Sequence, residues 1–164
     1  MKTVYIALIG RIKRILKDLE RVVDRAESLM DKAKLTGDDG YLDGVALNLH
    51  GFYAGVEKIF EDIARTLEKN IPDGSGWHQD LLLQMTAEIS PIRPPVISEE
   101  TRDCLDEYRG FRHVVRNVYT FNLQMSRLQE LTKGLQNCYV AITRDLDDFM
   151  EFLKELSVEN NDNK

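Results

Sequence analysis

Long stretches of the chain carry apolar residues spaced three and four positions apart, and this spacing constrains the fold more than any other feature. Between about residues 4 and 35 the spacing is almost unbroken. Its apolar positions include Ile12, Ile15, Leu16, Leu19, Val22, Val23, Ala26, Leu29, Met30 and Ala33. Residues three and four apart lie on one face of a helix, so the pattern predicts a long amphipathic helix. Only 10 glycines and 4 prolines occur in 164 residues, which favours long helices over a sheet cut by many turns.

The same spacing predicts further helices along the chain. We expect them at residues 41–70, 77–89, 99–122 and 126–156. The stretch from Gly37 to Gly40 reads as a tight turn that makes the first two helices antiparallel. Residues 90–98 contain three prolines and cannot be helical throughout, so they predict an extended connector of fixed shape. Ser98 then offers an N-cap to the helix that follows.

These elements predict an all-α fold, an antiparallel bundle of four main helices plus one short helix. A chain of 164 residues fits one domain, and we expect a single domain over residues 1–164 with a disordered polar tail at 157–164. Gly51 and Gly55 form a GxxxG pattern inside the second helix. In a soluble bundle this pattern predicts a close approach of two helices.

The charge balance restricts the partners of the protein. The formal net charge is −6, with 28 acidic against 22 basic residues. A protein that coats phosphate backbones is usually basic, so any RNA contact should use a local patch. The same balance argues against a binder of anionic membranes. The apolar run at residues 4–9 is too short for a signal peptide or a membrane span, so we expect a cytoplasmic protein.

The cysteines and two of the histidines show no metal-binding pattern. Cys104 and Cys138 belong to no CxxC or zinc spacing; we expect them to be small buried or half-buried residues, although a disulfide is possible in principle. His50 and His78 lack the additional ligands at defined spacing that a metal site needs. We therefore expect no metal and no cofactor.

One stretch, YRGFRHVVRNVY from Tyr108 to Tyr119, carries three arginines and a histidine but no acid. At about 100° per residue, a helix places the four side chains within a face of roughly 100°. These four residues are Arg109, Arg112, His113 and Arg116, with Tyr119 beside Arg112 and Asn117 beyond His113. Arginine makes forked contacts with phosphate, and histidine can exchange a proton near neutral pH.

An arginine and a histidine around one phosphodiester suffice for RNA cleavage without a metal. The imidazole activates the 2′-hydroxyl or protonates the leaving oxygen, and the guanidinium stabilises charge at phosphorus. A structural alternative stays open from the residues alone. The arginines could pair with acids of neighbouring helices, such as Glu57, Glu61 and Asp62, and His113 could be a hydrogen-bonded core residue.

Two segments resemble a known family. FRHVVRNVYTFNL (Phe111 to Leu123) resembles the late-helix signature of HepT-like proteins in the HEPN superfamily, and LHGFYAGVEKIFEDIA (Leu49 to Ala64) resembles their second-helix pattern. The resemblance extends over most of the chain in helix order and loop placement. It implies a ribonuclease toxin that forms a homodimer, acts on an RNA substrate and is neutralised by an MNT-like nucleotidyltransferase antitoxin. In some such systems the antitoxin attaches AMP to a tyrosine near the motif.

The resemblance implies specific roles for the residues of this face. The catalytic candidates are His113, Arg109 and Arg112, and the substrate-binding candidates are Arg116, Asn117 and Tyr119. Only three residues separate Arg109 from His113, where the family has four to six, and no histidine follows the Arg116–Asn117 pair. Tyr108 and Tyr119 are the tyrosines near the motif. The alternative function is a non-catalytic helical bundle whose Arg/His face binds RNA, a nucleotide or an acidic protein. A third possibility is a purely structural bundle in which those arginines are paired internally.

Overall fold

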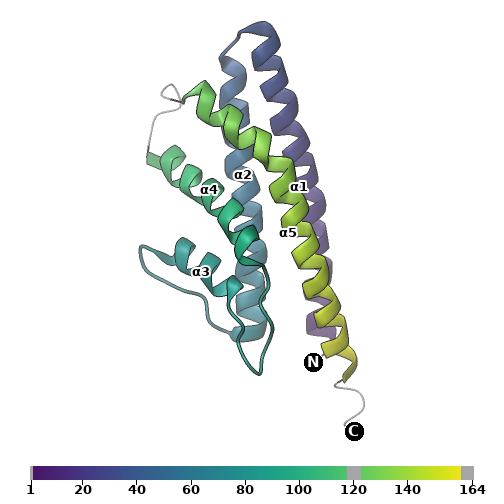
Figure 1. Cartoon of the computed structure of the whole chain (residues 1–164). Coiled ribbons are helices and arrows are strands. Elements are labelled where there is room, and N and C mark those ends of the chain that lie inside the picture. The colour runs from purple at the N-terminus through teal and green to yellow at the C-terminus, as the bar shows by residue number, and fades with distance from the viewer. Residues whose placement is uncertain (1, 118–122, 160–164) are drawn as a thin grey trace.

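The computed structural model describes residues 2–117 and 123–159, with side chains described for residues 3–112 and 123–159. The described residues form helices connected by turns and one longer connector, which confirms the all-α class. The helices are α1 (Lys2–Thr36), α2 (Gly40–Ile63), the π-helical turn η1 (Ala64–Glu68), α3 (Trp77–Thr86), α4 (Glu99–Asn117) and α5 (Met125–Glu159). In Figure 1, α1, α2 and α5 run lengthwise beside one another, and α3 and α4 pack on α2.

The first two helices form an antiparallel hairpin through a short turn, as predicted. Gly37 adopts a φ of +69° and its N–H donates to the Ala33 carbonyl at 3.0 Å. That left-handed conformation favours glycine, which lacks the Cβ that would be strained there. The Asp38 carboxylate accepts from the Gly40 N–H at 2.9 Å, so the turn leads directly into α2.

Glycines let α1 and α2 approach closely at two points. A Cβ added to Gly55 would lie 2.6 Å from Leu19 Cδ2, and one added to Gly44 would lie 2.8 Å from Leu29 Cδ1. A Cβ added to Gly51 would meet nothing within 4 Å. The close helix contact predicted from the GxxxG pattern therefore depends on Gly55, with Gly44 as a second contact that the pattern did not identify.

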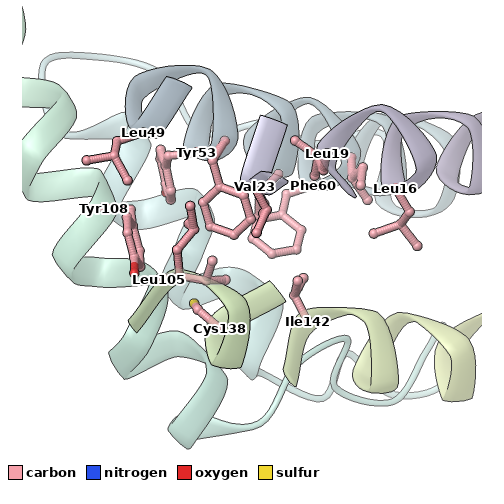
Figure 2. Close-up of a cluster of buried hydrophobic side chains, with 14 of the residues drawn as sticks. Leu16, Leu19, Val23, Leu49, Tyr53, Phe60, Leu105, Tyr108, Cys138 and Ile142 are labelled. Atoms are coloured by element: carbon pink, nitrogen blue, oxygen red, sulfur yellow. The ribbon is translucent and has the colours of Figure 1, made fainter. Parts of the chain in front are cut away.

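The core lies between α1, α2, α4 and α5. Figure 2 shows side chains from all four helices meeting in one cluster. The labelled members are Leu16, Leu19, Val23, Leu49, Tyr53, Phe60, Leu105, Tyr108, Cys138 and Ile142. Burial of each large apolar side chain contributes about 1.5–3 kcal/mol, so this cluster is a main source of stability.

Helix α5 closes the bundle by packing along α1. The ends of α1 and α5 that lie nearest the chain termini meet at the same end of the bundle (Figure 1). The Tyr139 hydroxyl donates to the Leu16 carbonyl at 2.9 Å, across 123 positions of sequence. Contacts of this kind join the first and last helices directly.

Helix α4 is fixed against α5 at three points. At its start, the Ser98 hydroxyl accepts from the Thr101 N–H at 3.1 Å, which confirms the predicted cap, and Asp145 of α5 accepts from the Ser98 N–H at 3.0 Å. One turn later, a disulfide joins Cys104 to Cys138, with the Cα atoms 5.9 Å apart. Further along, the buried Tyr108 hydroxyl donates to the Leu131 carbonyl of α5 at 2.7 Å.

The connector before α4 has a fixed shape because it surrounds a buried arginine. The Arg93 guanidinium contacts the Glu68 carboxylate and donates to the carbonyls of Gln84, Ala87 and Pro94. A buried guanidinium must have all its donors satisfied, so one side chain holds the ends of η1, α3 and the connector together.

Several helix bounds differ from the predicted ones. Helix α3 ends at Thr86 instead of residue 89, because Ala87 turns into an extended conformation whose carbonyl accepts from Arg93. Helix α5 continues to Glu159, beyond the predicted end at residue 156. Helix α4 is described as far as Asn117, and the rest of its predicted span lies outside the described residues. No described helix combines the length and the apolar character that a membrane span requires.

Candidate functional site

A buried carboxylate, Glu57 of α2, lies at the centre of a polar cluster formed by three helices. Glu57 is only 4% exposed. One oxygen accepts from Arg112 Nη1 at 2.7 Å, and the other lies 2.7 Å from His78 Nδ1. A carboxylate in such surroundings needs charged or hydrogen-bonding partners, because burying it alone is costly.

Arg112 reaches this carboxylate from the C-terminal part of α4. Its Nη1 also lies 3.0 Å from His78 Nδ1, so the guanidinium touches both partners. The side chain is 18% exposed. Its Nε is buried and has no hydrogen-bond partner among the described residues. The arginine is therefore held in place by Glu57 while part of it reaches the surface.

The third member, His78, lies in the first turn of α3. Trp77 stacks on the imidazole, with ring centroids 3.7 Å apart and planes tilted by 32°. Nδ1 lies 2.7 Å from a Glu57 oxygen, which can only accept, and 3.0 Å from Arg112 Nη1, which can only donate, so the two contacts favour opposite tautomers. We assign the proton to Nδ1, because the contact with Glu57 is the shorter one and Arg112 Nη1 already donates to the other Glu57 oxygen. A neutral imidazole in this tautomer has its lone pair on Nε2, at the opposite edge of the ring. The side chain is 24% exposed, far more than Glu57.

The structure separates the two described arginines of the predicted face. Arg112 joins the cluster, whereas Arg109 Nε donates to Asp106 of the same helix at 2.7 Å. The structural alternative, pairing with neighbouring acids, is thus correct for Arg112 and Glu57. The Asp62 carboxylate accepts from Arg11 of α1 at 2.6 and 3.0 Å and pairs with neither of the two described arginines of the face.

The structure does not describe the side chains of the other predicted site residues. His113, Arg116 and Asn117 belong to the helical backbone of α4, and their side chains lie outside the described part. Tyr119 lies outside the described residues altogether. The predicted catalytic and binding roles of these four residues stay predictions.

Sequence reasoning missed the place of His78 in this cluster. The histidine was weighed only as a metal ligand, and it comes from a short helix 34 positions before Arg112. The one signal in the sequence was its position directly after the single tryptophan. Nothing in a helical periodicity indicates that α3 would place its first turn against α2 and α4.

Two buried tyrosines, one from α2 and one from α4, have raised pKa values. Burial raises the pKa of Tyr53, and the nearby Glu57 carboxylate raises it further. The Tyr53 hydroxyl is buried with no hydrogen-bond partner among the described residues. Burial also raises the pKa of Tyr108, whose hydroxyl is engaged with Leu131. In this conformation Tyr108 is inaccessible to a modifying enzyme, which argues against it as an AMP-accepting tyrosine.

Together the three side chains offer a defined set of chemical functions. The guanidinium of Arg112 supplies positive charge for an anionic oxygen, and the imidazole of His78 can take or give a proton. The Glu57 carboxylate orients both. Among the described residues, no group of three or more His, Cys, Asp or Glu side chains is arranged to hold a metal ion.

Comparison with known proteins identifies the family. The family model described as HepT-like protein matches residues 44–153, which include all three members of the cluster. No curated protein and no solved structure shows a significant match to the chain. The matched region is well over half of the sequence and contains most of α2, all of α3 and α4, and most of α5. The chain therefore belongs to the HepT-like protein family.

Proposed function

We propose that this protein is a HepT-like toxin, an endoribonuclease that cleaves RNA without a metal ion. The observation that supports the proposal is the cluster of Arg112, His78 and Glu57, in which a buried acid holds an arginine next to an imidazole. RNA carries its own nucleophile, the 2′-hydroxyl, so an arginine beside an imidazole is the minimal set of groups that cleaves its phosphodiester bond.

The chemistry uses the 2′-hydroxyl of RNA. An imidazole removes its proton, the 2′ oxygen attacks phosphorus, and the guanidinium stabilises the extra negative charge. Arg112 is the described residue suited to the charge. The imidazole comes from a histidine of the site, for which the sequence predicts His113 and the cluster offers His78. DNA lacks the 2′-hydroxyl and should be spared.

The family resemblance supports the biological setting of the proposal. The protein acts in the cytoplasm as a homodimer, and an MNT-like nucleotidyltransferase neutralises it. Co-expression tests this partnership directly, since the proposed antitoxin should restore growth that the toxin alone arrests.

Cleavage of purified RNA is the decisive test. The protein is incubated with tRNA or mRNA in EDTA, and the products are resolved on a denaturing gel. Arg112→Lys keeps a positive charge for Glu57 but loses the planar fork, and the cleavage rate should fall by about 10²–10³-fold, as when one transition-state donor is removed. Exposed Arg25→Lys on α1 is the matched control. His113→Ala tests the predicted imidazole. Absence of cleavage by the folded wild-type protein refutes the proposal.

A second candidate function rests on a different observation. Both described arginines of the face are already paired, Arg112 with Glu57 and Arg109 with Asp106. Fixed and partly neutralised arginines suit a surface that binds RNA, a nucleotide or an acidic protein without cutting. This candidate predicts RNA binding that weakens as salt rises, with intact RNA recovered afterwards.

A further inference from the structure

We propose that His78 is a catalytic residue of this site, the group that removes the proton from the 2′-hydroxyl of RNA. The inference rests on the proposed ribonuclease function and names a residue outside the Arg/His face of α4. It is carried by the position of His78, whose Nδ1 contacts both Glu57 and Arg112.

The surroundings of His78 hold the imidazole in a single orientation. Glu57 fixes one edge of the ring through Nδ1, and Trp77 covers one face at 3.7 Å. A carboxylate that accepts from one ring nitrogen sets the tautomer and places the basic lone pair on the other nitrogen. Because Glu57 is buried, its orientation is set by the core and not by solvent.

The three side chains of the cluster differ in how much of each is exposed to solvent. Glu57 side-chain exposure is 5%, whereas Arg112 and His78 expose 18% and 24%. The carboxylate therefore supports the cluster from the interior, and the guanidinium and imidazole are its accessible parts. A phosphodiester that approaches Arg112 comes within reach of the neighbouring imidazole, since the two side chains are 3.0 Å apart.

The reaction step balances with the groups named. His78 Nε2 takes the 2′-hydroxyl proton as the bond between the 2′ oxygen and phosphorus forms. The bond from phosphorus to the 5′ oxygen breaks, and that oxygen takes a proton from water. The products are a 2′,3′-cyclic phosphate and a 5′-hydroxyl, and His78 returns its proton to solvent. Arg112 holds the phosphate oxygens during the step.

The variant His78→Asn separates the loss of catalysis from a loss of structure. Its side-chain amide can replace the Nδ1–H donor to Glu57, but it has no counterpart of the basic Nε2. His78→Asn should therefore fold like the wild-type protein and cleave RNA about 10²–10⁴-fold more slowly, the usual effect of losing a general base. The fluorescence of the single tryptophan, which stacks on residue 78, reports whether the local structure is kept. Gln79→Asn, at an exposed position next to His78 on α3, is the control and should retain wild-type activity.

Imidazole rescue gives a second, independent measurement. His78→Ala leaves space for free imidazole, which should restore part of the lost cleavage, whereas the same addition should not accelerate Arg112→Lys. Wild-type cleavage together with full activity in folded His78→Asn overturns the inference and leaves the proposed ribonuclease function standing. Loss of activity in His78→Ala without any rescue by imidazole also counts against it. No cleavage by wild-type protein refutes both proposals together.

Discussion

Gly55→Ala should destabilise the bundle, whereas Gly51→Ala should stabilise it. Both glycines are half-buried in the middle of α2, four residues apart. A helical glycine is about 1 kcal/mol less favourable than alanine, so both substitutions gain this amount. At Gly55 the new Cβ would lie 2.6 Å from Leu19 Cδ2 and 3.3 Å from Leu19 Cγ.

The clash at Gly55 should outweigh the gain in helix propensity. Leu19 is 2% exposed and packed in the core, so it cannot turn away freely. Overpacking of this kind costs about 1–3 kcal/mol, and the two variants should therefore differ by about that amount. For a chain of this length, 1 kcal/mol corresponds to about 2–4 °C in melting temperature. Urea unfolding followed by circular dichroism measures the free energy of unfolding directly.

A chain that also carries Leu19→Ala tests whether contact with Leu19 causes the destabilisation. In a Leu19→Ala chain the clashing atoms are gone, so Gly55→Ala should now stabilise by about 1 kcal/mol, as Gly51→Ala does in the wild-type chain. Equal stabilisation by the two alanines in the wild-type background would refute the reasoning. A destabilisation at Gly55 that persists after Leu19 is truncated would show that its cause lies elsewhere.

Three further predictions concern buried groups. Burial raises the pKa of Tyr53 and Tyr108, so above about pH 10 the unfolded chain binds fewer protons than the folded one. The free energy of unfolding should therefore fall as pH rises. Replacing both tyrosines by phenylalanine should reduce this fall, as measured by urea unfolding at pH 9–11. Arg93→Ala removes the charged partner of the buried Glu68 carboxylate and should lower the free energy of unfolding in urea by about 3–5 kcal/mol. Exposed Arg25→Ala should change it by less than about 0.5 kcal/mol. The disulfide between α4 and α5 closes a loop of 34 residues, so reduction with dithiothreitol should lower the free energy of unfolding by about 4 kcal/mol. An unchanged midpoint of urea unfolding, with both thiols shown to be free by titration, would contradict this.

Much of the fold could be predicted from periodicity and breakers. The long apolar stripes, the turn at Gly37 and the cap at Ser98 are local features, and the structure has each of them. The end of α3 could not be predicted, because the carbonyl that leaves the helix there bonds to Arg93, six positions away in a different segment. The prolines indicated a connector of fixed shape, but not the buried guanidinium around which it folds.

The candidate site was predictable only in part, for a similar reason. Residue type and helical angle placed Arg112 on the correct helix and suggested Glu57 as a partner. His78 could not be found this way, since its contact with Arg112 depends on how α3 packs against two other helices. Arg109 bonds within its own helix at a spacing of three residues. That pairing was readable from the sequence, because Asp106 precedes Arg109 by one turn.

The packing of α5 along α1 determines the order in which the chain can fold. The α1–α2 hairpin has local contacts and can form early, because little chain entropy is lost in closing a three-residue turn. The contact between Tyr139 and Leu16 spans 123 residues, which a ribosome adds in about 6–25 s. During synthesis the apolar face that α1 and α2 present to α5 is therefore uncovered for seconds. In that interval the hairpin depends on its own interface, including the close approach at Gly55, to hold its shape until the last helix arrives.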